Sequence, residues 1–125
     1  KQITGTVPII KAYAGMGIGD GIISLLAPEK IDGVVIEALG AGNLPPLAAR
    51  EIKSLMDKGV PVVLVSRCFN GIAEPVYAYE GGGVKLQEAG VMFIKELNAP
   101  KARLKLLIAL SAGLEGQELK DYIEG

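Results

Sequence analysis

The feature that most constrains the fold of this chain is a series of short apolar runs separated by segments of helical periodicity. Four runs have strand character, and they cover Val7–Tyr13, Val34–Leu39, Val60–Ser66 and Val91–Ile94. Uninterrupted apolar runs that are rich in valine and isoleucine are typical of strands covered on both faces. Strands that alternate with helices imply right-handed crossovers and a parallel sheet. The sequence therefore predicts a small three-layer α/β domain, flavodoxin-like, with a four-stranded parallel sheet flanked by helices.

Helical spacing is visible in four further segments, which cover residues 18–26, 48–56, 98–110 and 114–123. The second has Pro45 or Pro46 in its first turn and Gly59 as its stop. The third begins after Asn98, a good N-cap residue. Within it, Arg103 is expected on the solvent side of the helix or in an ion pair across an interface. No helix is predicted between the third and fourth strands.

Size, charge and residue types exclude several classes of function. A chain of 125 residues and 13.0 kDa fits one domain, residues 1–125. A formal net charge of −1 gives no electrostatic footprint for nucleic acid, and no apolar run is long enough to span a membrane. A single cysteine excludes an internal disulfide and favours a cytoplasmic location, with a secreted or periplasmic one left open.

The residue types also limit the chemistry of a site. Because the chain has no histidine, it can hold no Ser-His or Cys-His nucleophilic pair. Carboxylates do not cluster at the spacing of a calcium loop, and one cysteine cannot build a zinc site, so no metal is expected. The glycines of Gly15–Gly21 do not follow the GxGxxG spacing of dinucleotide-binding loops. We therefore expect no cofactor.

Three glycine-rich segments each follow a predicted strand. They are Gly15–Gly21, Gly40–Asn43 and the long connection Arg67–Gly83. The carboxyl ends of parallel strands meet at one edge of a sheet, where open α/β sheets keep their binding sites. We therefore expect a binding site at this edge, with the Asn43 side chain exposed in it. A helix-cap role for Asn43, just before Leu44 and Pro45, is the competing interpretation.

Three longer stretches resemble a known family. They are Ile31–Pro45, which contains Gly-Ala-Gly-Asn, then Val63–Arg67, and then Leu97–Leu110, which contains Asn-Ala-Pro-Lys-Ala-Arg. In order and spacing they are similar to the C-terminal domain of bacterial-type L-asparaginases, over nearly the whole chain. The resemblance implies hydrolysis of L-asparagine to L-aspartate and ammonia. It also implies a catalytic N-terminal domain that is absent from this chain, and a homodimer or homotetramer.

The same resemblance implies the division of roles. The family's nucleophilic threonines, with an aspartate and a lysine, belong to the N-terminal domain, so no catalytic residue is expected in this chain. The C-terminal domain completes the substrate pocket of a neighbouring subunit. Asn43 corresponds to the family's asparagine, which helps to hold the α-amino end of the substrate. The acidic partner falls between Glu74 and Glu80; Glu80 is our choice, whereas ungapped spacing points nearer Tyr77.

A physical argument supports these substrate-binding residues. The amino group of the substrate is cationic, and an amide oxygen together with a carboxylate supplies the acceptors that it needs. Two other functions are kept open. The chain also looks similar to the C-terminal half of the asparaginase-like subunit of a glutamyl-tRNA(Gln) amidotransferase. A stand-alone flavodoxin-like ligand-binding module is the third possibility.

Overall fold

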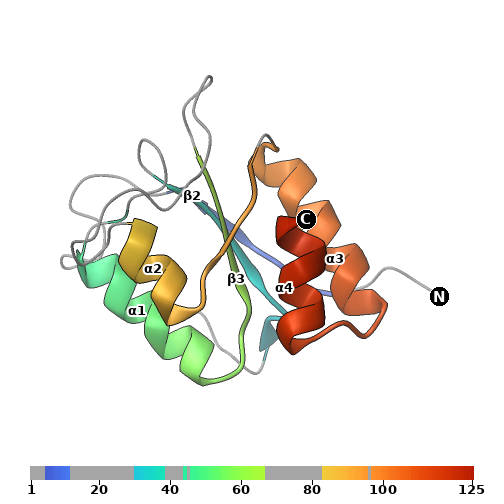
Figure 1. The fold of residues 1–125 in the computed structure, drawn as a ribbon, viewed down its shortest axis with the longest axis horizontal. Coiled ribbons are helices and arrows are strands. Elements are labelled where there is room, and N and C mark those ends of the chain that lie inside the picture. Colours follow the sequence, from blue (N-terminus) through green and yellow to red (C-terminus); the bar gives the residue numbers. More distant parts are fainter. Residues whose placement is uncertain (1–4, 12–29, 39–43, 45, 67–82, 96) are drawn as a thin grey trace.

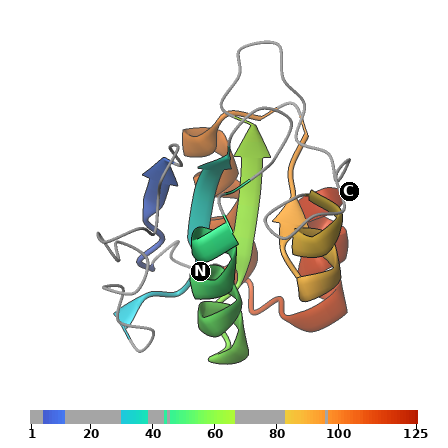
Figure 2. The same ribbon diagram turned by 90° about the vertical axis from the view of Figure 1, so that its left-hand side faces the viewer.

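The computed structural model describes residues 5–11, 30–38, 44, 46–66, 83–95 and 97–125. Four parallel strands in this part form one sheet, whose order β1-β2-β3-β4 follows the chain (Figures 1 and 2). Their bounds are β1 (Ile9–Lys11), β2 (Val34–Ala38), β3 (Val62–Ser66) and β4 (Met92–Phe93). The predicted four-stranded parallel sheet is confirmed.

Four helices accompany the sheet in the described residues. Their bounds are α1 (Pro46–Asp57), α2 (Gly83–Ala89), α3 (Ala99–Ser111) and α4 (Gly116–Glu124). Three of them correspond to helices predicted from the sequence, whereas α2 was not predicted. The helix predicted over residues 18–26 lies outside the described residues.

The helices form one layer on each side of the sheet. The strand order follows the chain, so right-handed crossovers carry α1 and α2 to the same face, and α3 and α4 cover the opposite face (Figure 1). Along β2, Ile36 packs with Ile52 of α1, whereas Val35 packs with Leu106 of α3. A strand that is covered on both faces therefore needs consecutive apolar residues, as at Val34, Val35 and Ile36.

Three of the helices end in the same way. A glycine with positive φ follows the last turn, at Gly59 (φ +89°), Gly90 (φ +113°) and Gly113 (φ +83°). The next residue donates its backbone N–H to the carbonyl oxygen five positions back, as in Val60 to Leu55 at 3.2 Å. This is the Schellman motif, and it requires the left-handed conformation that glycine adopts without strain.

The N-terminus of α3 is capped as predicted. Asn98 has extended backbone angles, and its Oδ1 accepts a hydrogen bond from the backbone N–H of Lys101 at 3.0 Å. We expect Asn98→Ala to lower the free energy of unfolding by about 1 kcal/mol, because one helix N–H loses its partner. Urea unfolding measures this loss. Asn98→Ser keeps an acceptor and should stay within about 0.5 kcal/mol of the wild type; equal losses in both variants would contradict the cap.

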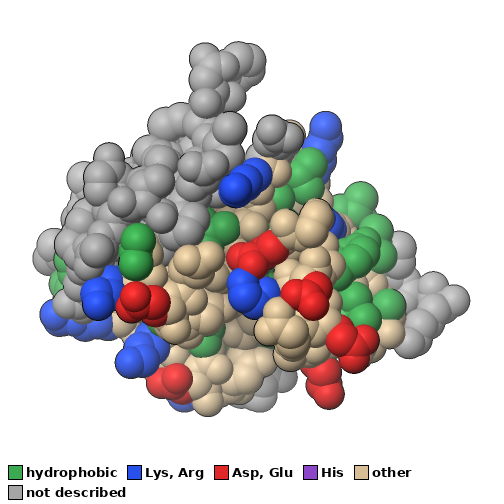
Figure 3. Space-filling model, in the orientation of Figure 1, with side chains coloured by type: hydrophobic (Ala, Val, Ile, Leu, Met, Phe, Trp, Pro, Cys, Tyr) green, Lys and Arg blue, Asp and Glu red, His purple; other side chains and the backbone are tan. Residues whose placement is uncertain are grey.

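The kind of side chain on the surface differs between the helices. On the face drawn in Figure 3, basic and acidic side chains mix over α1, α2 and α4, whereas hydrophobic side chains gather over α3.

Candidate functional site

The predicted site lies at the carboxyl edge of the sheet. There β2 ends at Ala38 and β3 ends at Ser66, and these two residues are register partners in neighbouring parallel strands. The segments that follow, 39–43 and 67–82, therefore leave the sheet at the same edge. The predicted substrate-binding residues Asn43, Tyr77 and Glu80 belong to these segments and lie outside the described residues. Their roles stay predictions.

The described residues on either side of Asn43 bear on its two interpretations. Ala38 is fully buried, and Leu44, the residue directly after Asn43, is buried in the same core cluster. Within the described residues, α1 begins at Pro46, three positions after Asn43. Asn43 itself lies outside the described residues, so both interpretations of its side chain stay predictions.

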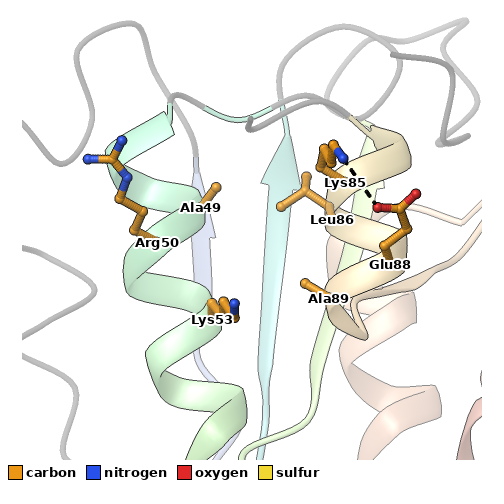
Figure 4. A pocket seen from close by; sticks show the side chains of 7 residues that line it. All are labelled: Ala49, Arg50, Lys53, Lys85, Leu86, Glu88 and Ala89. Atoms are coloured by element: carbon orange, nitrogen blue, oxygen red, sulfur yellow. Dashed lines mark ion pairs between the residues drawn. The ribbon is translucent and has the colours of Figure 1, made fainter. Parts of the chain in front are cut away.

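A groove of about 410 Å³ runs between α1 and α2 (Figure 4). Ala49 and Lys53 point from α1 towards α2, and Leu86 points back from α2. On α2, Lys85 forms an ion pair with Glu88, with 3.6 Å between Nζ and Oε2. None of the described residues that line the groove carries a hydroxyl or thiol that could attack an amide. We therefore assign no chemical step to it.

The described residues supply neither a metal centre nor a membrane segment. In the ranges that the structure describes, no three His, Cys, Asp or Glu side chains are grouped so that they could hold a metal ion. Among the same residues, no helix is long and apolar enough to cross a membrane.

The Asn-Ala-Pro-Lys-Ala-Arg stretch has a structural role in this domain. Asn98 caps α3, and the fully buried Ala102 lets the helix lie close to the sheet. Arg103 is half-buried, and its Nε donates a hydrogen bond to the carbonyl oxygen of Val7 at 2.7 Å. The expectation of a solvent-facing Arg103 is therefore wrong, because the segment before β1 packs against this side of α3, whereas an ion pair across an interface stays a prediction.

The fold and the predicted site together define a class of protein. It is a three-layer α/β domain with a four-stranded parallel sheet, an architecture in which binding sites lie at the carboxyl edge of the sheet. The chain belongs to the Glutaminase/Asparaginase C-terminal domain family, whose model matches residues 6–123.

Similarity to individual known proteins agrees with this family assignment. The chain is 46% identical over 114 residues to a probable L-asparaginase of Deinococcus radiodurans, covering 91% of this chain and 34% of that protein. It is 33% identical over 115 residues to a glutamyl-tRNA(Gln) amidotransferase subunit of Pyrococcus furiosus, covering 91% and 25%. The crystal structure of L-asparaginase I from Vibrio cholerae matches with a TM-score of 0.79 and 26% identity, covering 98% and 36%. The chain thus spans about a third or less of the length of these proteins.

Proposed function

We propose that this chain is the C-terminal domain of an L-asparaginase, an amidohydrolase that converts L-asparagine and water into L-aspartate and ammonia. The single observation that carries the proposal is the family match over residues 6–123. The 46% identity to a probable L-asparaginase supports the choice within the family. In this function the domain completes a substrate pocket whose reactive groups come from an N-terminal domain, in a homodimer or homotetramer.

The proposed contacts follow from the charge of the substrate. The oxygen of the Asn43 amide and the carboxylate of Glu80 accept hydrogen bonds from the cationic α-amino group of asparagine. Tyr77 adds a hydroxyl group on the same segment. The register of the preceding strands supports this assignment, because Ala38 and Ser66, after which the two segments begin, are partners in neighbouring strands.

Catalysis is assigned to residues outside this chain. The only threonines of the sequence are Thr4 and Thr6, ahead of β1. Thr6 is exposed, and its backbone N–H donates to the carboxylate of Asp32 at 2.7 Å. Since the sequence contains no histidine either, the chain can hold no Ser-His or Cys-His pair. The isolated chain should therefore be inactive.

A fusion protein tests this proposal. It joins the N-terminal two thirds of the Deinococcus radiodurans relative to this chain, which replaces that relative's own C-terminal third. We expect the fusion to release ammonia from L-asparagine, whereas the isolated chain and the isolated N-terminal two thirds release none. A coupled glutamate dehydrogenase assay follows the ammonia. A folded fusion without activity, or activity of the 125-residue chain alone, would contradict the proposal.

The second candidate is the asparaginase-like subunit of a glutamyl-tRNA(Gln) amidotransferase. The match to the amidotransferase subunit of Pyrococcus furiosus favours it, since that match covers as much of this chain at 33% identity. The higher identity of 46% to a probable L-asparaginase ranks it second.

We place the protein in the cytoplasm, on the ground of its single cysteine.

A further inference from the structure

The outer face of α3 carries an exposed apolar pair. Leu104 is 51% exposed and Ile108 is 38% exposed, and the two lie one turn apart on the same side of the helix. The other large hydrophobic side chains exposed to a similar degree in the described residues stand singly on β1, α1 and α4. Figure 3 shows hydrophobic side chains gathered over α3.

Helix α3 is therefore apolar on two opposite sides. Ala102, Leu106 and Ala109 face the sheet and are buried, whereas Leu104 and Ile108 face outwards. The other long helices differ, because the outward positions of α1 and α4 are mainly charged or polar, as at Lys53, Asp57, Glu118 and Asp121. A helix with apolar residues on opposite sides is typical of one that is covered on both sides. A second layer is thus expected over α3.

The described start of the chain lies against this helix. A Cβ built on Gly5 would stand 3.2 Å from Cδ2 of Leu107, and Arg103 binds the carbonyl oxygen of Val7. The family is named for a C-terminal domain, and the matched relatives are about three times as long as the matched region. In a protein of that length, a preceding domain would be joined to this one through the residues before Gly5, and Gly5 lies beside α3.

We propose that the outer face of α3, centred on Leu104 and Ile108, is the docking surface for the N-terminal catalytic domain. This inference rests on the proposed function and adds the surface that holds the two domains together. All charged residues of α3 are basic, and they are Lys101, Arg103 and Lys105. The complementary surface is accordingly apolar, with an acidic group opposite the exposed Lys101.

Hydroxyl-radical footprinting tests the surface without any substitution. The oxidation rates of Leu104 and Ile108 are compared between the isolated chain and the fusion with the N-terminal two thirds of the Deinococcus radiodurans relative. We expect at least fivefold slower oxidation in the fusion. Met56 of α1 is the reference, since it packs on the opposite face of the sheet and should change less than twofold. Equal rates at Leu104 and Ile108 in both proteins would overturn the inference.

The result separates the docking surface from the proposed function. Protection of both side chains in a fusion that releases no ammonia supports the surface and contradicts the function. An active fusion in which both side chains stay unprotected supports the proposed function and contradicts the docking surface. Protection that develops in the isolated chain as its concentration rises, with no further gain in the fusion, would show that a second copy covers α3. That outcome would overturn the inference.

A single substitution gives an independent measurement. We expect Leu104→Glu to shift the melting temperature of the isolated chain by no more than 2 °C, and to lower that of the fusion by at least 5 °C. The isolated chain is the matched control, because it carries the same substitution without the docked domain. Equal shifts in the two proteins would contradict docking at this surface.

Discussion

Replacing Leu106 with alanine should lower the free energy of unfolding by about 3 kcal/mol, a large part of the stability of a domain of this size. Leu106 is fully buried where α3 crosses the sheet, in one cluster with Val35 and Val63. A Cβ built on Gly33 would lie only 2.8 Å from Cδ2 of Leu106, so the side chain already touches backbone. Strand backbone on one side and helix on the other cannot collapse into the cavity that alanine leaves.

Leu104 provides the matched control for this prediction. It lies on the same helix, two residues earlier, but its side chain is half exposed. Leu104→Ala removes the same atoms and should cost less than about 1 kcal/mol in the isolated chain, because little of the lost surface was buried. Urea unfolding with an unchanged m-value measures both variants. Similar losses for the two would show that α3 does not pack against the sheet through Leu106.

The parts of the fold that the sequence predicts are those with strong local signals. Most residues of the central strands β2 and β3 are apolar and fully buried, as at Val34–Ile36 and Val62–Val65, and such runs can be recognised without knowledge of distant residues. Helix α3 has a local signal at each end, the N-cap residue Asn98 before it and Gly113 after it. The edge strands are less regular. Pro8 has no N–H to pair, and β1 starts only at Ile9, two residues later than predicted.

Helix α2 escaped prediction because it is short. Its seven residues contain one buried leucine, Leu86, and a single buried apolar position gives no periodicity. The signal that could have found it is the Gly90-Val91 pair. The Gly59-Val60 pair, which lies between the end of α1 and the start of β3, has the same sequence and the same Schellman hydrogen bonds.

For the candidate site too, one part of the arrangement can be predicted from the sequence and another part cannot. Alternation of strands and helices predicts which edge the segments 39–43 and 67–82 leave, because that depends only on strand direction. It cannot rank Tyr77 against Glu80, because the choice depends on the backbone path of a long segment without periodicity. The role of Arg103 was missed for a related reason. Its partner Val7 lies 96 positions away in the sequence, and helical spacing contains no information on such contacts.

Asn43→Ala should lower kcat/KM for L-asparagine in the fusion by about 10- to 100-fold and raise KM. The substitution removes one acceptor from the cationic amino group of the substrate, and a hydrogen bond to a charged group contributes about 1.5–3 kcal/mol. Steady-state kinetics over a range of asparagine concentrations measures both constants. The melting temperature should stay within about 2 °C, because in the proposed role the Asn43 side chain binds the substrate and caps no helix.

Asn98→Ala in the same fusion is the matched control, since it removes the same side chain from a position that caps α3. It should lower stability by about 1 kcal/mol and leave kcat/KM unchanged. The two substitutions are therefore expected to have opposite effects. Asn43→Ala lowers kcat/KM and leaves the melting temperature nearly unchanged, whereas Asn98→Ala lowers stability and leaves kcat/KM unchanged. A lower melting temperature with wild-type kinetics for Asn43→Ala would make that residue a structural one. The carboxyl edge of the sheet would then lose the acceptor on which the proposed substrate contacts depend.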